Sequence, residues 1–298
     1  MTQKRILAVI FLFALFSLPG QAQQNNASRA EIEKSYTLWR QAMVNKSARQ
    51  WQQYTASHRQ IEIRNRFFSE HVPFPQAVFA LPVAPPDITK LKALSIRVNG
   101  PTAKAIYFGK VDFGVGGKPT DNLLVISFFK EGGVWKYDLS EFVNLDALPA
   151  IRAAIIKGDN SYIDQADFMP DGLIPRPAVS LKGPVPYIAK VYVFSPGREV
   201  EVQVNRLSRH LFQNIVASEV VIGGARGGDN QVEFKIKNIP GGTGKEALTI
   251  RVYLMSEIEG IKPIKAYEYL VPAGENFTPA ATQTFEVTSA MGGEILGR

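Results

Sequence analysis

The chain has 298 residues and no cysteine, and its 34 basic and 27 acidic side chains give a net charge of +7. The lack of cysteine excludes disulfides, thiolate metal sites and the cysteine-linked lipid anchor of bacterial lipoproteins. A positive charge of this size over so long a chain predicts a mildly basic surface and no nucleic-acid partner.

The first 22 residues have the features of a cleavable signal peptide. Lys4 and Arg5 precede an uncharged run of thirteen apolar residues, and Gly20 and Ala22 supply the small side chains that a signal peptidase requires. A helix of that run would reach only about 20 Å, which is too short for a bilayer core of roughly 30 Å. We therefore expect cleavage near Ala22, no stable membrane anchor, and a periplasmic or extracellular protein.

A proline-rich stretch divides the remaining chain. Five prolines fall within residues 166–186. Proline fixes φ and donates no amide hydrogen, so neither a helix nor a central strand can persist there. We predict an α+β domain over 23–165, a semi-rigid extended linker over 166–186, and an all-β domain over 187–298.

The first domain opens with helical periodicity. A capping box at Ser28 predicts the helix start, and apolar residues follow at helical spacing at Ile32, Tyr36, Trp39 and Met43. Two further helices are predicted around Trp51 and over 61–68. Five prolines then interrupt the pattern over 73–86, in a segment that could be a lid, a rim or an extended crossing.

A period of two then predicts an antiparallel meander. Its strands are expected at 94–98, 103–111, 123–129 and 134–139, followed by a helix at 147–157. Helices followed by such a meander are typical of an α+β domain.

One hairpin of this meander carries a resemblance to a known family. Residues 124–138 combine an apolar strand, a Lys-Glu-Gly-Gly turn and a Trp-Lys pair. They resemble the last hairpin of NTF2-like (SnoaL-like, cystatin-type cone) domains, and 32–43 is similar to the first helix of that family. The resemblance covers 28–160 and implies a cone whose cavity serves ligand binding or acid–base chemistry. The proline-rich insert and the helix after the last strand depart from the compact form of the family.

The second domain has the pattern of a β-sandwich. Seven strands are predicted, at 187–194, 199–205, 212–222, 231–237, 248–257, 264–271 and 282–288. Seven short strands separated by glycine- and proline-rich turns predict an immunoglobulin-like or fibronectin-III-like sandwich.

The predicted cone supplies the candidate ligand-binding residues. Its wall is expected to draw on Tyr36, Trp39, Phe67, Tyr107, Phe128, Trp135 and Tyr137, with His58 and Asp112 as nearby polar groups. Such an aromatic set is more often plain core than a ligand pocket. His71 and Asp138 are further polar candidates, because a buried carboxylate with a raised pKa can act as a general base.

Catalytic and cofactor signatures are absent from the sequence. The three histidines are not at metal-ligating spacings, and there is no nucleophile elbow. The loop 241–246 differs from a phosphate-binding loop because Ile239 occupies its first glycine position and Glu246 its Ser/Thr position. We predict no cofactor, no metal and no catalytic residue.

The favoured hypothesis is an exported, non-catalytic binding protein. Its cone would bind a small apolar ligand or an envelope or extracellular protein, and its sandwich would be an accessory interaction module.

The alternative is a cofactor-free isomerase or hydrolase with an acid–base residue in the cone. A third reading is carbohydrate contact through Tyr187, Tyr192, Tyr267 or Tyr269. The basic stretch 58–66 is interpreted as a solvated helix face rather than a polyanion-binding site. If it did bind a polyanion, lipid headgroups or acidic polysaccharides would be the plausible anions for an exported protein.

Overall fold

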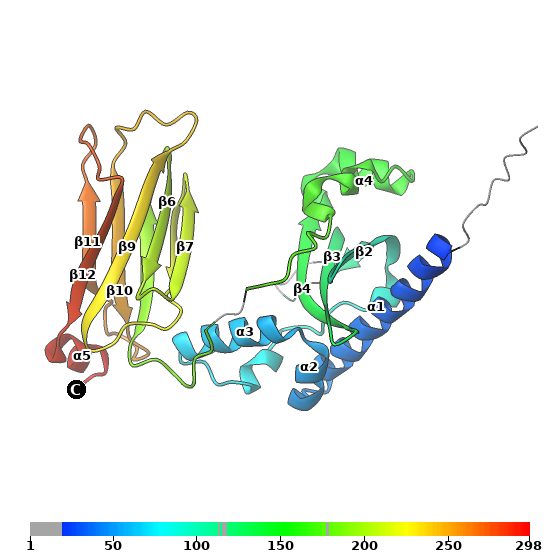
Figure 1. Ribbon diagram of the computed structural model, residues 1–298, viewed down its shortest axis with the longest axis horizontal. Coiled ribbons are helices and arrows are strands. Elements are labelled where there is room, and N and C mark those ends of the chain that lie inside the picture. Colours follow the sequence, from blue (N-terminus) through cyan, green and yellow to red (C-terminus); the bar gives the residue numbers. More distant parts are fainter. Residues whose placement is uncertain (1–19, 113, 115–117, 177–178) are drawn as a thin grey trace, which may run out of the picture.

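The computed structural model describes residues 20–112, 114, 118–176 and 179–298. It contains an N-terminal α+β domain and a C-terminal all-β domain, which confirms the predicted fold class (Figure 1). The predicted leader lies outside the described residues, except for its last three, which belong to the first helix. No helix within the described ranges is long and apolar enough to span a membrane.

The α-helices of the first domain are α1 (Gly20–Val44), α2 (Ala48–Tyr54), α3 (Ser57–Ser69) and α4 (Pro149–Ile156). The prediction that α1 begins at Ser28 is wrong, because the helix runs through this residue. The glutamine and alanine residues before Ser28 have high helix propensity and continue the helix toward the N-terminus. Ser47 does cap α2, since its hydroxyl accepts a hydrogen bond from the backbone N–H of Gln50.

A four-stranded antiparallel sheet follows the order of the chain. Its strands are β1 (Lys92–Asn99), β2 (Thr102–Val111), β3 (Thr120–Glu131) and β4 (Val134–Asn144). β3 lies inside the sheet and its middle is buried on both faces, as its apolar sequence predicts. β4 is an edge strand with a β-bulge: Ser127 pairs with Leu139 and Phe128 with Tyr137, which leaves Asp138 as the extra residue.

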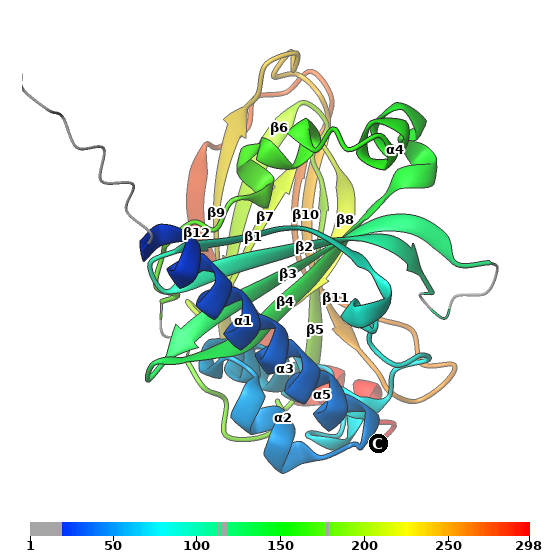
Figure 2. The same cartoon turned by 90° about the vertical axis from the view of Figure 1, so that its right-hand side faces the viewer.

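Both faces of this sheet are covered. α1 crosses the inner face diagonally, while α4 lies on the opposite side (Figure 2). The outer face packs against α4 and short 3-10 turns, with Leu145, Ile155 and Phe168 in its core. These turns are η3 (Leu145–Ala147), η4 (Ser161–Asp164) and η5 (Ala166–Phe168).

The proline-rich insert closes the inner face. It contains η1 (Gln76–Phe79) and η2 (Ile88–Lys90) and buries Val78 and Ile88 among the aromatic residues of α1 and the sheet. The C-terminal end of the insert is bound to α1, because the Tyr36 hydroxyl donates a hydrogen bond to the Pro86 carbonyl at 2.8 Å. The insert therefore packs on the inner face through Val78 and Ile88.

The second domain consists of two four-stranded antiparallel sheets, ordered β11-β10-β5-β8 and β12-β9-β6-β7. The strands are β5 (Ile188–Phe194), β6 (Arg198–Val204), β7 (Ser208–Gln213), β8 (Val216–Val220), β9 (Gly228–Asn238), β10 (Leu248–Met255), β11 (Ile264–Val271) and β12 (Ala280–Val287). The strand expected over 212–222 is in fact β7 and β8. The chain turns between them at Asn214, whose φ is +49°, so eight strands replace the predicted seven.

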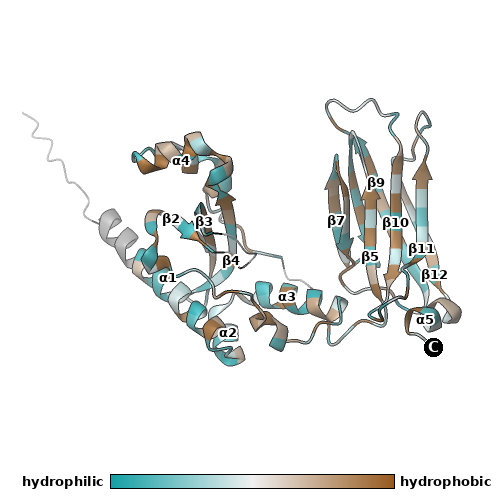
Figure 3. Ribbon diagram, turned by 180° about the vertical axis from the view of Figure 1, so that it is seen from behind, coloured by the Kyte–Doolittle hydropathy of each residue, from teal (hydrophilic) through white to brown (hydrophobic). Residues whose placement is uncertain are grey.

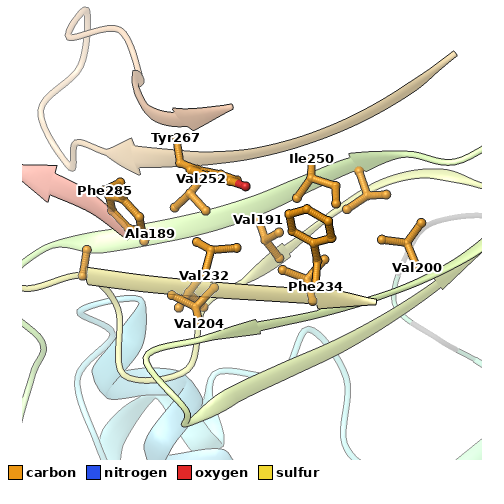
Figure 4. Packing of buried hydrophobic residues seen from close by; sticks show 14 of the residues in the cluster. Ala189, Val191, Val200, Val204, Val232, Phe234, Ile250, Val252, Tyr267 and Phe285 are labelled. Carbon is orange, nitrogen blue, oxygen red and sulfur yellow. The ribbon is translucent and has the colours of Figure 1, made fainter. Parts of the chain in front are cut away.

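The core of the sandwich lies between the two sheets. Alternate residues of β6 are buried, and hydrophobic residues form bands along β5 and β10 (Figure 3). Figure 4 shows Val191 and Val252 of one sheet meeting Val232 and Phe234 of the other. The helix α5 (Ser289–Ile295) covers one end, where Ile295 joins this core. Period-two burial of apolar side chains therefore holds the second domain together without disulfides.

Candidate functional site

The aromatic residues predicted to line a cone pocket form the core of the first domain. Those that are almost wholly buried are Tyr36, Trp39, Tyr107, Phe128 and Trp135, and Phe67 and Tyr137 pack against them. The Trp39 and Tyr137 rings are stacked, with centroids 3.6 Å apart and planes 15° apart. Side chains therefore fill the space around Tyr36, Trp39 and Tyr137, which has the geometry of a packed core. A hollow of about 370 Å³ lies beside it, between α1, Tyr54 and the β3–β4 turn, with Trp135 in its lining.

The tyrosine hydroxyls in this core bind three separate acceptors. That of Tyr36 donates to Pro86, that of Tyr107 contacts the Glu33 carboxylate at 3.3 Å, and that of Tyr137 lies 3.1 Å from Ser140 Oγ. Burial raises the pKa of Tyr137 to about 12, so its phenol is neutral near pH 7. The three hydroxyls do not converge on one point where a substrate oxygen could be held.

The two polar candidates, Asp112 and His58, lie in different places. Asp112 is exposed after β2 and accepts a hydrogen bond from the backbone N–H of Gly114 at 2.8 Å. His58 lies near the start of α3, where its Nε2 is 2.9 Å from Asp138 Oδ1. The structure thus gathers the seven aromatic candidates, leaves Asp112 exposed, and pairs His58 with Asp138, the neighbour of Tyr137 in β4.

Asp138, the bulge residue, is held by two side chains of α3. Arg59 Nε lies 2.9 Å from the same oxygen that His58 contacts. Burial by itself raises the pKa of Asp138, but the hydrogen bond from His58 and the charge of Arg59 outweigh it and leave the pKa below its ordinary value. Asp138 is therefore a stable carboxylate and is poorly suited to take up a proton near pH 7.

The junction of the two domains holds a site that the sequence did not reveal. Asn65 of α3 is buried, and its side chain forms hydrogen bonds with the linker backbone. Its Nδ2 donates to the Val179 carbonyl at 2.6 Å, and its Oδ1 accepts from the Leu181 N–H at 2.9 Å. One amide side chain thus fixes the linker against the helix.

The end of α3 also contacts the sandwich. Ser69 Oγ accepts a hydrogen bond from the Gly223 N–H at 2.9 Å. Beyond the helix, the His71 ring lies between Glu257 Oε2, at 2.7 Å from its Nδ1, and the Val185 carbonyl, at 2.6 Å from its Nε2. These contacts hold the first domain, the linker and the sandwich together around α3, which lies between the two domains in Figure 1.

A cleft of about 820 Å³ opens beside this junction, and we call it the interdomain cleft. It lies between α3, the linker, and the β6–β7 turn with the start of β7. Five of its lining residues are arginines, and Glu62 is the one acidic lining residue. The arginines are Arg59 and Arg66 of α3, Arg176 of the linker, Arg206 of the turn and Arg209 of β7.

Three of these arginines have carboxylate partners. Arg59 binds Asp138 and Glu62, while Arg66 contacts Glu70 at 3.2 Å and Arg209 contacts Glu201 at 3.4 Å. The other two are Arg176 and Arg206. Arg206 donates only to the neutral Gln231 side chain, and Arg176 has no hydrogen-bond or ion-pair partner within the described part of the chain.

This arrangement leaves the cleft positively charged. Five guanidinium groups stand against the four carboxylates of their partners, which leaves an excess of one positive charge. Arg176 and Arg206, which have no carboxylate partner among the described residues, come from different walls. A guanidinium group presents a planar fork of donors that matches a carboxylate or a phosphate. The cleft can therefore hold an anion between the linker and the sandwich.

Only part of this site could be recognised from the sequence. The basic stretch 58–66 includes Arg59 and Arg66, but its period also fits a solvated helix face. Arg176, Arg206 and Arg209 are more than a hundred residues away, and only the docking of α3 brings them together.

The tyrosines considered for carbohydrate contact do not form such a surface. Tyr267 is buried, and Tyr187 and Tyr269 pack against the sandwich core, where Tyr269 lies 4.5 Å from the Phe234 ring between centroids. Tyr192 is partly buried. No protein-family model, curated protein or solved structure matches this chain.

Proposed function

We propose that this protein is an exported, non-catalytic binding protein that recognises an anionic partner in the interdomain cleft. The observation that carries the proposal is the pair Arg176 and Arg206. Both guanidinium groups lie in one cleft and have no carboxylate partner in the part of the chain that the structure describes, so their charges are available to a ligand. A cleft lined by one sign of charge concentrates oppositely charged ligands and speeds their association.

The filled core of the first domain supports a site outside it. We propose that this domain is a divergent NTF2-like domain and that the sandwich is an immunoglobulin-like module. The helices and four-stranded sheet of the one, and the paired four-stranded sheets of the other, support this assignment. Because Trp39, Tyr137 and the insert fill the inner face, the first domain serves as a scaffold that presents α3.

A titration with two chemically unlike polyanions tests the proposed function. Poly-L-glutamate and oligogalacturonate would be titrated into the wild type and the double variant Arg176→Gln/Arg206→Gln at low and high salt. We expect binding that weakens with salt, and a loss of about tenfold in the double variant. Arg49→Gln is the matched control, since Arg49 is exposed on α2 and lines no part of the cleft. Equal binding by all three proteins, or none, would refute the proposal.

Export has its own experiment. The mature protein from a culture would be sequenced at its N-terminus and located by cell fractionation. A new N-terminus after Ala22 in the periplasmic or extracellular fraction is expected. An intact leader on a protein retained in the cytoplasm would contradict this part of the proposal.

The cofactor-free enzyme remains a second candidate because of one observation. His58 and Asp138 form a pair at 2.9 Å, and the Nδ1 of His58 is buried without a hydrogen-bond partner among the described residues. A histidine oriented by a carboxylate can act as a general base. A panel of ester and enone substrates tests this candidate. Turnover that disappears in Asp138→Asn while the fold is retained would favour the enzyme over the binding protein.

A further inference from the structure

We infer that the partner is an extended acidic segment of another protein, which binds by adding a strand to the free edge of β7. This inference rests on the proposed function and specifies its partner. β7 is the last strand of its sheet and pairs with β6 alone. Along such an edge, every second residue directs its N–H and C=O groups away from the sheet, where an incoming strand can pair with them.

The interdomain cleft continues along this edge. A second hollow of about 530 Å³, which we call the edge groove, lies between β7 and β8 and shares Arg66, Arg209 and Ile222 with the cleft. β8 is likewise the last strand of its sheet. The six residues of β7 extend over about 20 Å. Together the two hollows are lined by the first three residues of β7, Ser208, Arg209 and His210, so an extended peptide has access to the start of this edge.

The charges around β7 select an acidic strand. Arg206 precedes the strand, Arg209 is exposed on it, and Arg66 faces it from α3. A second copy of this edge would bring like charges together, so these arginines disfavour pairing of the protein with itself. A strand that carries carboxylates meets attraction at the same positions.

The edge groove also contains two carboxylates, and both are already bound. Glu70 contacts Arg66, and Glu219 contacts the His210 ring at 2.7 Å across the groove. Lys190 adds a further positive charge to this lining. Arg209 is itself paired with Glu201, so Lys190 is the lining cation that has no carboxylate partner in the described part of the chain.

Other anions fit the site less well. No phenylalanine, tyrosine or tryptophan lines either hollow in the described part of the chain. Nucleotide bases and sugar rings bind by stacking on such flat apolar surfaces. A membrane surface is flat and cannot enter a cleft between two domains. By contrast, Ile63, Leu207 and Ile222 line the cleft among the arginines. They suit a strand with acidic side chains on one face and apolar side chains on the other.

The test uses an eight-residue peptide of alternating Glu and Val, labelled with a fluorophore and titrated into the full-length protein. Two matched peptides carry N-methyl groups on alternate residues, one set on the glutamates and the other on the valines. Each has the charge of the parent but lacks the amide donors along one edge. Oligogalacturonate and anionic phosphatidylglycerol vesicles are the competing anions. Circular dichroism would verify that each protein variant is folded.

We expect the parent peptide to bind, one N-methyl isomer to bind about tenfold more weakly, and the other to bind like the parent. This pattern would show that one edge of the peptide backbone pairs with β7. The double variant Arg176→Gln/Arg206→Gln should bind the parent peptide about tenfold more weakly than Arg49→Gln does.

Two results would overturn the inference and leave the proposed function intact. One is equal binding of all three peptides, which means that charge alone acts. The other is tighter binding of oligogalacturonate or vesicles than of the peptide, which assigns the cleft to a polysaccharide or a lipid. If no anion binds, or if the arginine variants change nothing, both the inference and the proposed function fail.

Discussion

His71 and Glu257 join the two domains directly: Nδ1 of the histidine lies 2.7 Å from Oε2 of the glutamate. The Val185 carbonyl faces the other ring nitrogen at 2.6 Å. The ring therefore bridges a glutamate of the sandwich and a carbonyl of the linker. The backbone of His71 is left-handed, with φ of +55°, which turns the chain out of α3 toward the sandwich.

The first prediction concerns this contact. His71→Asn removes both hydrogen bonds and keeps a residue that tolerates a left-handed backbone. The loss of such bonds costs about 1 to 3 kcal/mol, so the junction should open about tenfold more often. Trypsin cleavage after the exposed Lys182 of the linker should accelerate by a similar factor.

Lys46→Asn is the control for this experiment. Lys46 also has a positive φ, of +51°, but lies in the α1–α2 turn. Cleavage at Lys182 should be unchanged in this variant. An equal rate in His71→Asn and the wild type would show that the His71 contact does not hold the junction closed.

The second prediction concerns Asn65. Asn65→Ala removes both hydrogen bonds that tie the linker backbone at Val179 and Leu181 to α3. A hydrogen bond contributes about 0.5 to 1.5 kcal/mol, so the free energy of unfolding in urea should fall by about 1 to 3 kcal/mol. Asn65→Asp keeps the acceptor for Leu181 and loses the donor for Val179. A fall of less than about 0.5 kcal/mol in the alanine variant would contradict the role of Asn65 as a clamp.

The third prediction is the pH dependence at Asp138. The pKa of this carboxyl group is below its ordinary value of 3.8 in the folded protein. A lowered folded pKa stabilises the fold above the unfolded pKa, and this stability is lost as the pH falls through the folded value. Asp138→Asn should therefore be less stable than the wild type near pH 7, and the difference should shrink below about pH 3.8. Chemical denaturation at several pH values measures it. A difference that stays constant across this range would contradict the prediction.

The fourth prediction tests whether the first domain can bind an apolar ligand. Trp39→Ala removes a buried ring that stacks on Tyr137, and should cost about 3 to 5 kcal/mol and leave a cavity. Added indole should refill this cavity and raise the melting temperature of the variant. The wild type should show no such rise, because its side chains already fill the space. Stabilisation of the wild type by indole would restore the apolar pocket as a candidate site.

The sequence by itself determined the classes of both domains. Each element buries its apolar side chains at its own sequence period. The alternation of Val200, Val202 and Val204 therefore predicts a strand, and the spacing of Ile32, Tyr36 and Trp39 predicts a helix. The same reasoning recognised that the aromatic set is typical of a core. It missed the break between β7 and β8, because Asn214 interrupts an apolar run without a glycine or proline signal.

Only the tertiary structure decided where a partner could bind. The interdomain cleft depends on how Asn65, Ser69 and His71 dock α3 against the linker and the sandwich. These contacts join residues more than a hundred positions apart, so no local pattern in the sequence indicates them. Whether Arg176 and Arg206 keep a free charge likewise depends on which carboxylates lie nearby in space. Fold class follows from short-range patterns of hydrophobicity, whereas this site follows from long-range packing and the balance of charges that it creates.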